Sequence, residues 1–483
     1  MVQLSNIEKL EEKDIPKLVD TVKKELDKKE KLYERYRRKK NDSDIIKGRK
    51  NLNISFEKYI IDNASGYLGG KEPTYEVQIT SDEKKKGLLK KLLGKVFPSD
   101  SYAEEMKTVI DHIVDYNDDG TENYTLVKDL LITGTCYEIL YENNENEMVY
   151  TRKDPLQTQA IWDYSVPRNL IGIVNLYEEQ DINGKLTTVV ELTDKTGTRQ
   201  FKGSGSNYEE QQLDDKYKNH NWGDVPFTVA EIPDGIGLFE PVIDLIEAYE
   251  ELVQGLKETF KYNNNAKLKV TGYRPQDELL VRDEATGEMV ENPIRKKFDE
   301  QLLKAPVFYT PDDGDIDWII KSIDDGSTQN TLKTYIDLIM MITGVPQTTD
   351  LGFTKADNAS AIDRKFFTLE QVTTQAMQLL KMAYKRRWEL IFNRYNIKGQ
   401  KFDFRDIKIT LNKNLPANEN EVIDMYMKLR GLISDETIIE RLPLDLDANS
   451  ENIKVQEQEQ EDLENEVKKA SAMSGFNNKN KEE

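Results

Sequence analysis

The sequence predicts an α+β fold in which long helices flank a region of antiparallel strands. Residues 239–262 and 360–395 carry apolar side chains at steps of three and four, the pattern of a helix with one buried face. Between residues 134 and 229 the apolar pattern alternates every second residue and is interrupted by turn signals such as Asn183-Gly184, which indicates antiparallel strands. For a chain of 483 residues we expect two or more domains.

The composition leaves two relations to nucleic acid open. The chain is 33% charged and its formal net charge is -21, which argues against a protein that grips nucleic acid, because phosphate binding draws on clustered Lys and Arg. The same charge suits a duct through which a polyanion slides, because a like-charged or neutral lining makes no strong phosphate contacts.

The sequence gives no targeting or membrane signal. It has no apolar N-terminal signal region and no uninterrupted apolar run of about 18 residues. We therefore expect a soluble protein made in a cytoplasm. A single cysteine, Cys136, excludes an intramolecular disulfide, and its apolar neighbours favour a buried core thiol over a reactive one.

The N-terminal third is predicted to be mainly helical. Residues 1–45 are dominated by charge and predict a peripheral, solvent-rich helical segment. An apolar helix follows at 59–70 and ends at a glycine pair. Its Gly66 to Lys71 invites a phosphate-loop interpretation, which fails because Ser65 occupies the first glycine position and Glu72 stands where Ser or Thr should hold magnesium.

Residues 83–97 form a basic amphipathic patch, in which six lysines alternate with leucines and a valine. A solvated face over a local core is one interpretation, and a helix that lies on a membrane or anchors a partner is the other. A helix containing Met106 and Ile110 follows, and then the strand region begins.

The helix at 239–262 has one apolar and one strongly acidic side. Asn263 and the two asparagines after it end this helix. Strands are predicted at 266–271 and 305–310, with a polar excursion between them, and the chain returns to helix at about Gly326. The acidic side carries Glu240, Asp244, Glu247, Glu250, Glu251 and Glu258.

A helix at 331–343 ends at the break Gly344-Val345-Pro346, and a short polar loop leads to the long helix that begins at about Ser360. Ser360 and Asp363 make a capping-box pattern, with Asp in place of Glu. The apolar face predicted for the long helix comprises Ile362, Phe366, Leu369, Thr373, Ala376, Leu380, Ala383 and Leu390. Because a helix flanks it on either side, we expect this loop to project from the fold toward a partner or a cavity.

After Tyr395 the sequence predicts one strand at 402–411 and helices at 422–432 and 435–442. From Asn449 the chain is mostly Glu, Gln, Lys and Asn, and its last dozen residues are predicted to be disordered.

No catalytic or metal-binding constellation stands out. The two histidines, His112 and His220, have no cysteine or carboxylate at metal-ligand spacing, and no Gly-x-Ser-x-Gly elbow follows a strand. We therefore expect no enzymatic activity, metal or cofactor. Residues 384–388, Tyr-Lys-Arg-Arg-Trp, could stack single-stranded bases, but Tyr384 and Trp388 stand four apart on the long helix and are expected to pack in the core or an interface.

The order of these features resembles the portal, or head-to-tail connector, proteins of tailed phages, most closely those of long-tailed phages of Gram-positive hosts. One departure from the family is Ala361, where a glycine usually follows the serine, so the long helix is expected to start more firmly by roughly 1 kcal/mol. The stretches that carry the resemblance are Tyr59-Ile-Ile-Asp-Asn-Ala-Ser-Gly-Tyr-Leu-Gly-Gly70, Leu130-Leu-Ile-Thr-Gly-Thr-Cys-Tyr137, Gly344-Val-Pro346 followed by Asn358-Ala-Ser360, and Lys428-Leu-Arg-Gly-Leu-Ile-Ser-Asp-Glu-Thr437.

The resemblance implies a ring, usually of about twelve subunits, around a channel at one capsid vertex. It implies a charged N-terminal segment at 1–45, a wing at 46–235 and 359–413, stem helices at 236–262 and 325–344, a clip at 263–320, a tunnel loop at 345–358, a crown at 414–470 and a disordered tail at 471–483.

The resemblance also implies functional residues and partners. The implied partners are double-stranded DNA passing through the channel, the packaging terminase, head-tail adaptors, and major capsid and scaffolding proteins, with assembly in the host cytoplasm and no membrane. The tunnel-loop residues that would face DNA are Gln347, Thr348, Thr349, Asp350, Gly352, Thr354, Lys355, Asp357 and Asn358. The stem residues that would line the channel are Glu240, Asp244, Glu247, Glu251 and Glu258. The alternatives are a DNA-processing motor or nuclease subunit, and an anchoring module that uses residues 83–97.

Overall fold

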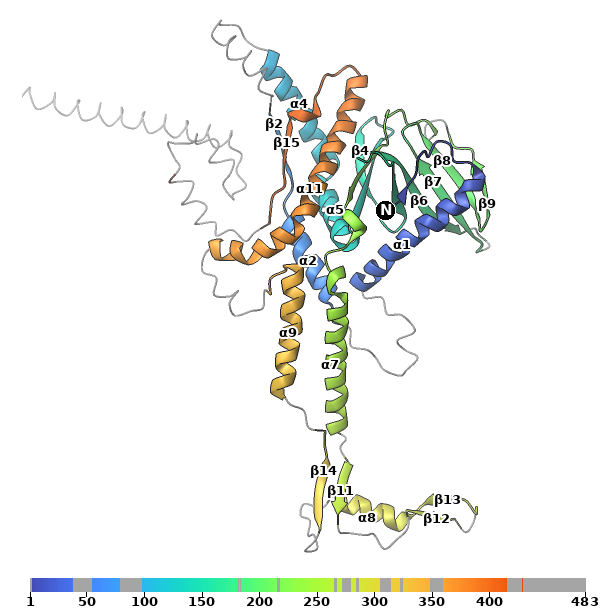
Figure 1. The fold of residues 1–483 in the computed structure, drawn as a ribbon, viewed down its shortest axis with the longest axis vertical. Helices are drawn as coiled ribbons and strands as arrows, with labels where there is room; N and C mark the ends of the chain where they lie inside the picture. The colour runs from blue at the N-terminus through green and yellow to red at the C-terminus, as the bar shows by residue number, and fades with distance from the viewer. Residues whose placement is uncertain are drawn as a thin grey trace, which may run out of the picture. The chain divides into compact units, whose positions relative to one another are not determined.

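The computed structural model describes residues 2–37, 54–78, 98–347 and 359–414 with Lys428, apart from gaps at 181, 183, 215–217, 265–266, 272–278, 284–285, 305–313 and 322–324. The chain divides into two compact units (Figure 1). Unit 1 comprises residues 1–36, 57–240 and 343–483, and unit 2 comprises residues 37–56 and 241–342. Helices and antiparallel sheets occur together, so the α+β class is confirmed.

Unit 1 contains a six-stranded sheet with the order β1-β5-β6-β7-β8-β9. All its pairings are antiparallel except that of β1 with β5. Neighbouring residues of its central strands are buried on opposite faces, because Val174 belongs to one core cluster and Ile173 to another. Its strands are β1 (Val2–Gln3), β5 (Thr158–Trp162), β6 (Leu170–Gln180), β7 (Leu186–Thr193), β8 (Thr198–Ser204) and β9 (Asn207–Gln211).

Helix α1 (Ile15–Arg37) packs on this sheet, after the short turn η1 (Glu12–Asp14) (Figure 1). Ile15, Leu18 and Val22 share one buried cluster with strand residues that include Val190 and Phe201. The predicted helix is therefore present, but its inner face belongs to the core of unit 1. The helix carries charge on its outer side and a complete apolar stripe on its inner side, and the stripe decides its position.

A second sheet of three strands has the order β10-β3-β4, and the helices α4 (Pro98–Tyr116), α5 (Asp119–Thr133) and α11 (Ala359–Ile397) accompany it. Its strands are β3 (Thr135–Glu142), β4 (Met148–Lys153) and β10 (Phe227–Glu231), and α11 runs along β10. A buried cluster that includes Tyr137, Ile173 and Phe227 joins this sheet to the six-stranded sheet. The turn η3 (Pro233–Gly235) follows β10.

A small sheet joins distant parts of unit 1. Strand β2 (Thr74–Val77), which follows helix α2 (Phe56–Gly69), pairs antiparallel with β15 (Ile407–Thr410), which follows the turn η5 (Phe404–Asp406). The predicted helix at 59–70 and the predicted strand at 402–411 correspond to α2 and β15.

The described residues of unit 2 form two long helices, short strands and one further helix. Helix α7 (Ile243–Asn264), preceded by η4 (Glu240–Val242), and helix α9 (Asp325–Thr343) correspond to the predicted helices. Strand β11 (Lys267–Thr271) was also predicted, and it pairs antiparallel with β14 (Asp315–Ile319). The other predicted strand, at 305–310, lies outside the described residues.

The polar excursion after β11 contains regular structure that the sequence interpretation missed. Strands β12 (Leu280–Arg282) and β13 (Met289–Glu291) form an antiparallel hairpin, and helix α8 (Pro293–Lys304) follows it. Each strand has only three residues, which is too short for a periodic signal. Where α7 ends, the Asn263 side chain donates to the Lys321 carbonyl at 3.0 Å and accepts from the Lys321 N–H at 2.9 Å.

Candidate functional site: the acidic helix, the loop anchors and the buried arginine

Helix α7 presents an exposed acidic stripe. Asp244, Glu247, Glu251 and Glu258 are all exposed, and their spacing of three, four and seven places them along one face of the helix. Only two residues of this 22-residue helix, Ile246 and Thr259, are buried. The side chains predicted to line a channel are therefore accessible on one helical face in the single chain.

Glu240 differs from the other acidic candidates because it belongs to η4. It is exposed, and its carboxylate accepts the Gly237 N–H at 3.1 Å. Glu250, which the sequence analysis also placed on the acidic side, accepts the Ile54 N–H at 2.7 Å and is half-buried. Glu240 and Glu250 thus serve local structure, whereas the stripe from Asp244 to Glu258 lies at the surface.

The segment after α9 is anchored at the point where the predicted tunnel loop begins. Gly344 has φ +72°, a left-handed conformation that favours glycine, and a Cβ there would lie 2.8 Å from the backbone of Leu369 in α11. Val345 is 1% exposed, so the Gly-Val-Pro break is part of the core of unit 1.

Helix α2 holds both ends of this loop. The Tyr59 hydroxyl donates to the Pro346 carbonyl at 2.9 Å, on the incoming side. On the outgoing side, the Tyr67 ring stacks on the ring of Phe366 in α11, with centroids 4.7 Å apart. We call Tyr59, Tyr67 and the residues they hold the α2 clamp. Of the predicted loop at 345–358, residues 345–347 lie within the described part and 348–358 lie outside it, so Gln347 is the one DNA-facing candidate that is described.

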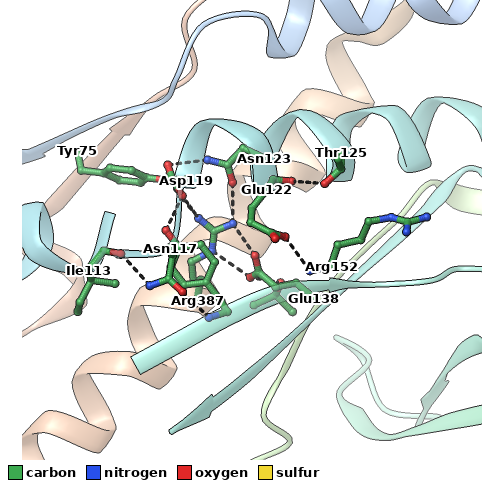
Figure 2. Close-up of polar contacts among 12 residues, drawn as sticks. Tyr75, Ile113, Asn117, Asp119, Glu122, Asn123, Thr125, Glu138, Arg152 and Arg387 are labelled. Atoms are coloured by element: carbon green, nitrogen blue, oxygen red, sulfur yellow. Dashed lines mark hydrogen bonds and ion pairs between the residues drawn. The ribbon is translucent and has the colours of Figure 1, made fainter. Parts of the chain in front are cut away.

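A buried arginine fixes the second half of α11 to the rest of unit 1 (Figure 2). Arg387 is fully buried and all five of its N–H groups are satisfied. Nε and Nη2 donate to the two oxygens of Glu138 at 3.0 and 2.7 Å, and Nη2 also donates to Asn123 at 2.7 Å. Nη1 donates to Asp119 at 2.7 Å and to the Tyr75 hydroxyl at 3.3 Å.

Aromatic rings enclose this guanidinium. Its central carbon lies 4.1 Å from the centroid of Tyr150 and 4.5 Å from that of Tyr384. Burial disfavours the charge, but Glu138 and Asp119 outweigh it and raise the pKa of Arg387 well above its usual value. Tyr384 and Trp388 are buried, as the packing interpretation of residues 384–388 requires, and they are not available to stack bases.

The residues with catalytic potential have structural partners instead. His112 pairs with Glu147 at 2.9 Å, and Nε2 of His220 lies 2.8 Å from the Asp194 carbonyl. Cys136 is buried, and burial raises the pKa of its thiol. Among the described residues, no group of three His, Cys, Asp or Glu side chains could hold a metal ion.

Two further sequence interpretations can be placed. Gly66 to Gly69 lie in the last turn of α2, whereas a phosphate loop precedes the first turn of a helix. The basic patch at 83–97 lies outside the described residues, and within the part of the chain that is described no helix is long and apolar enough to cross a membrane.

The features that stand out in the described residues are an exposed acidic helix face and a loop anchored at its start, which are typical of a structural protein with an interaction surface. The chain belongs to the phage portal protein family described as SPP1 Gp6-like, whose model matches residues 16–469. It is accordingly a structural protein of the virion, the head-to-tail connector located at the portal vertex of the capsid.

Two other comparisons add little. One similar solved structure is described as the neck of an empty GTA particle computed with C6 symmetry; it is 11% identical, with a TM-score of 0.39, over 84% of this chain and 95% of that one. Comparison with curated proteins found no match.

Proposed function

We propose that copies of this chain form a ring, of about twelve subunits, through which double-stranded DNA is packaged and later ejected. The observation that carries the proposal is helix α7, of which only Ile246 and Thr259 are buried. A helix this exposed gains most of its stability from packing against neighbours, and other copies of the chain supply such neighbours in a ring.

The acidic stripe of α7 suits the lining of that channel. DNA carries one negative charge per about 1.7 Å of helix axis. A ring of Asp244, Glu247, Glu251 and Glu258 side chains repels the phosphates, so the DNA slides without being held. The formal net charge of -21 fits a protein that surrounds DNA without wrapping it.

Imaging of the purified protein by negative-stain electron microscopy tests the ring. We expect rings with a central hole. Discrete monomers with nucleotide-dependent or metal-dependent activity would overturn the proposal in favour of a motor or nuclease subunit, and binding of the monomers to liposomes would favour the anchoring module at 83–97.

The second part of the proposal concerns Lys355, the only cation between Gln347 and Asn358. A ring of these lysines, set beside Asp350 and Asp357, would give weak, sequence-independent contact with phosphates at physiological salt. Gly352 would let the loop change backbone state as DNA moves.

We expect both Lys355→Ala and Lys355→Glu to lower DNA retention in packaging assays, and the charge reversal to lower it more, because it replaces attraction of the phosphates by repulsion. Lys413→Ala is the matched control, because Lys413 pairs with Glu370 at 2.5 Å in unit 1. Wild-type packaging and DNA retention in both Lys355 variants would show that Lys355 does not make this contact with DNA.

A further inference from the structure

Unit 1 contains an open groove of about 830 Å³ between α11 and the ends of strands β5, β6 and β10. Its apolar lining comes from both sides: Leu379 and Met382 on the helix, and Trp162, Leu170 and Val229 on the strands. Met382 is 66% exposed. The groove therefore offers apolar surface that nothing in the described part of the chain covers.

The walls of the groove are held in place by polar contacts. Arg386 pairs with Asp224 at 3.1 Å and donates to the carbonyls of Val225 and Phe227, both at 3.2 Å. On the opposite wall the Trp162 indole N–H donates to Glu231 at 2.8 Å. A groove with walls fixed in this way loses little freedom when it is filled, which favours binding.

The loop from Asp163 to Asn169 forms a rim of the groove and is itself locked. One oxygen of Asp163 accepts the backbone N–H groups of Ser165 and Asn169 at 3.1 and 2.8 Å, and the other accepts the Asn169 side chain at 2.9 Å. This rigid loop leaves Val166 99% exposed and Tyr164 65% exposed. Apolar side chains presented by a fixed loop beside a groove are typical of an interaction surface.

The apolar surface continues along α11 beyond the groove. Val372, Leu379 and Met382 are separated by seven and three residues, so they lie on one face of the helix, and Val372 is 44% exposed. A partner that fills the groove can therefore extend along more than two turns of the helix.

The charge of the groove indicates which partner it fits. The chain carries a formal net charge of -21, so most of its surface repels another copy of itself. The groove is lined by equal numbers of cations and anions: Arg168, Lys385 and Arg386 against Asp224, Glu231 and Glu389. It is a neutral, partly apolar patch, which a second copy can approach without net repulsion.

We propose that the groove and its rim at Tyr164 and Val166 receive a neighbouring copy of the chain and form one half of the contact between subunits. The inference rests on the proposed ring and identifies the surface that closes it. A ring contact is heterologous, so the groove of each copy meets a different surface of the next, and the same contact repeats until the ring closes.

A photo-crosslinking amino acid at position 382 tests the occupant directly, in an equal mixture of isotopically light and heavy full-length protein. We expect a product of twice the chain mass that contains light-heavy peptide pairs. Crosslinks confined to one chain would show that another segment of the same chain fills the groove, and no crosslink in assembled rings would show that it is open; both results overturn the proposal.

The substitution Met382→Glu tests the energetic role of the groove. Because Met382 is exposed, the variant is expected to keep the thermal unfolding midpoint of the wild type and to need at least about tenfold more protein to form rings. Ile182→Glu is the control, because Ile182 is a fully exposed apolar residue after strand β6, outside the groove.

If Met382→Glu forms rings at the wild-type protein concentration, or if Met382→Glu and Ile182→Glu weaken ring formation equally, the groove is not the contact between subunits. Either result would leave the proposal that the chain forms a ring unaffected. Failure of the unmodified chain to form rings would overturn both.

Discussion

Lys29 is a buried cation whose hydrogen-bond partners in the described structure are all neutral. Its Nζ lies 2.9 Å from the Tyr137 hydroxyl, 3.0 Å from the Thr158 carbonyl and 3.0 Å from the Gln159 side-chain oxygen. Burial lowers the pKa of Lys29 from 10.5 to about 7, and the attraction of Glu231 and Glu25 offsets this only in part. The residue that fastens α1 to the two sheets is therefore close to losing its proton at neutral pH.

This pKa predicts how stability depends on pH. Below pH 7 the amine is protonated in both the folded and the unfolded chain; between about 7 and 10.5 the unfolded chain alone keeps the proton. The free energy of unfolding should therefore rise with pH across this window, by up to about 1.4 kcal/mol per pH unit from this group. Lys29→Met should remove that rise, measured by denaturant unfolding from pH 6.5 to 9.5.

Lys28→Met provides the control for this experiment. Lys28 lies next to Lys29 on α1, but its side chain is 71% exposed and pairs with Glu25 at 3.2 Å, so its loss should leave the pH profile parallel to that of the wild type. Parallel profiles for wild type and Lys29→Met would show that Lys29 keeps its proton in the folded chain.

Arg387 shows what sequence patterns miss at the scale of single residues. Periodicity placed Tyr384 and Trp388 correctly in the core, and it gave no sign that the arginine between them is buried as well. Its carboxylate partners Glu138 and Asp119 lie 249 and 268 residues away along the chain, among many other acidic residues. Only the fold reveals which of these carboxylates satisfy it.

At the scale of elements, local patterns located the long helices, whereas long-range pairings could not be predicted. The positions of α7, α9 and α11 follow from their apolar spacing and from the glycine, proline and asparagine residues that end them. The partner of β11 turned out to be β14, and β2 found its partner β15 more than three hundred residues away. Pairing depends on which edges the fold brings together, and no local signal encodes this.

The anchor at Gly344 gives a prediction at this scale. Gly344→Ala puts a Cβ into contact with the backbone of Leu369 and forces a side chain into a left-handed conformation, which alone costs roughly 1–2 kcal/mol. We expect a lower thermal midpoint and faster proteolysis between α9 and α11.

Gly66→Ala, in α2, is the matched control for Gly344→Ala. A Cβ at Gly66 meets nothing within 4 Å, so alanine there should leave the thermal midpoint unchanged or raise it. The corresponding gain in the free energy of unfolding is up to about 1 kcal/mol. If Gly344→Ala has the same thermal unfolding midpoint as the wild type, the close approach of Gly344 to α11 does not restrain the loop.

At the scale of the whole molecule, the division into two units allows one unit to be altered without the other. The hairpin β12–β13 and helix α8 expose Leu280, Met289 and Ile294 in unit 2. Two-stranded hairpins are marginal alone, so this region is expected to be completed by a neighbour or partner. We expect it to dock the packaging terminase first and a head-tail adaptor later.

Deletion of residues 276–304 tests this assignment. Since the core clusters of unit 1 contain none of these residues, the shortened chain should keep the far-ultraviolet spectrum of a folded protein. It should lose binding to the terminase in pull-down experiments, whereas Ile182→Glu, which changes unit 1 alone, should bind as the wild type does. Terminase binding that survives the deletion would place the docking surface elsewhere.

The class of protein was accessible from the sequence because weak motifs occur in the family order along nearly the whole chain. The placement of α1 was not, since its many charges concealed a complete apolar stripe. The acidic residues proposed to face a channel lie between these cases: their spacing on α7 is visible in the sequence, whereas the burial of only two residues of this helix required the structure.

The α2 clamp has a mechanical consequence. Tyr59 holds Pro346 and Tyr67 stacks on Phe366, so the two ends of the loop are tied to one short helix. Because Ile60, Ile61 and Ala64 in that helix are fully buried, tension applied to the loop by moving DNA would be shared between both tethers and pass into the core of unit 1. In this arrangement α2 would bear the load between the two tethers, and α9, which ends before Pro346, would not have to unwind to absorb it.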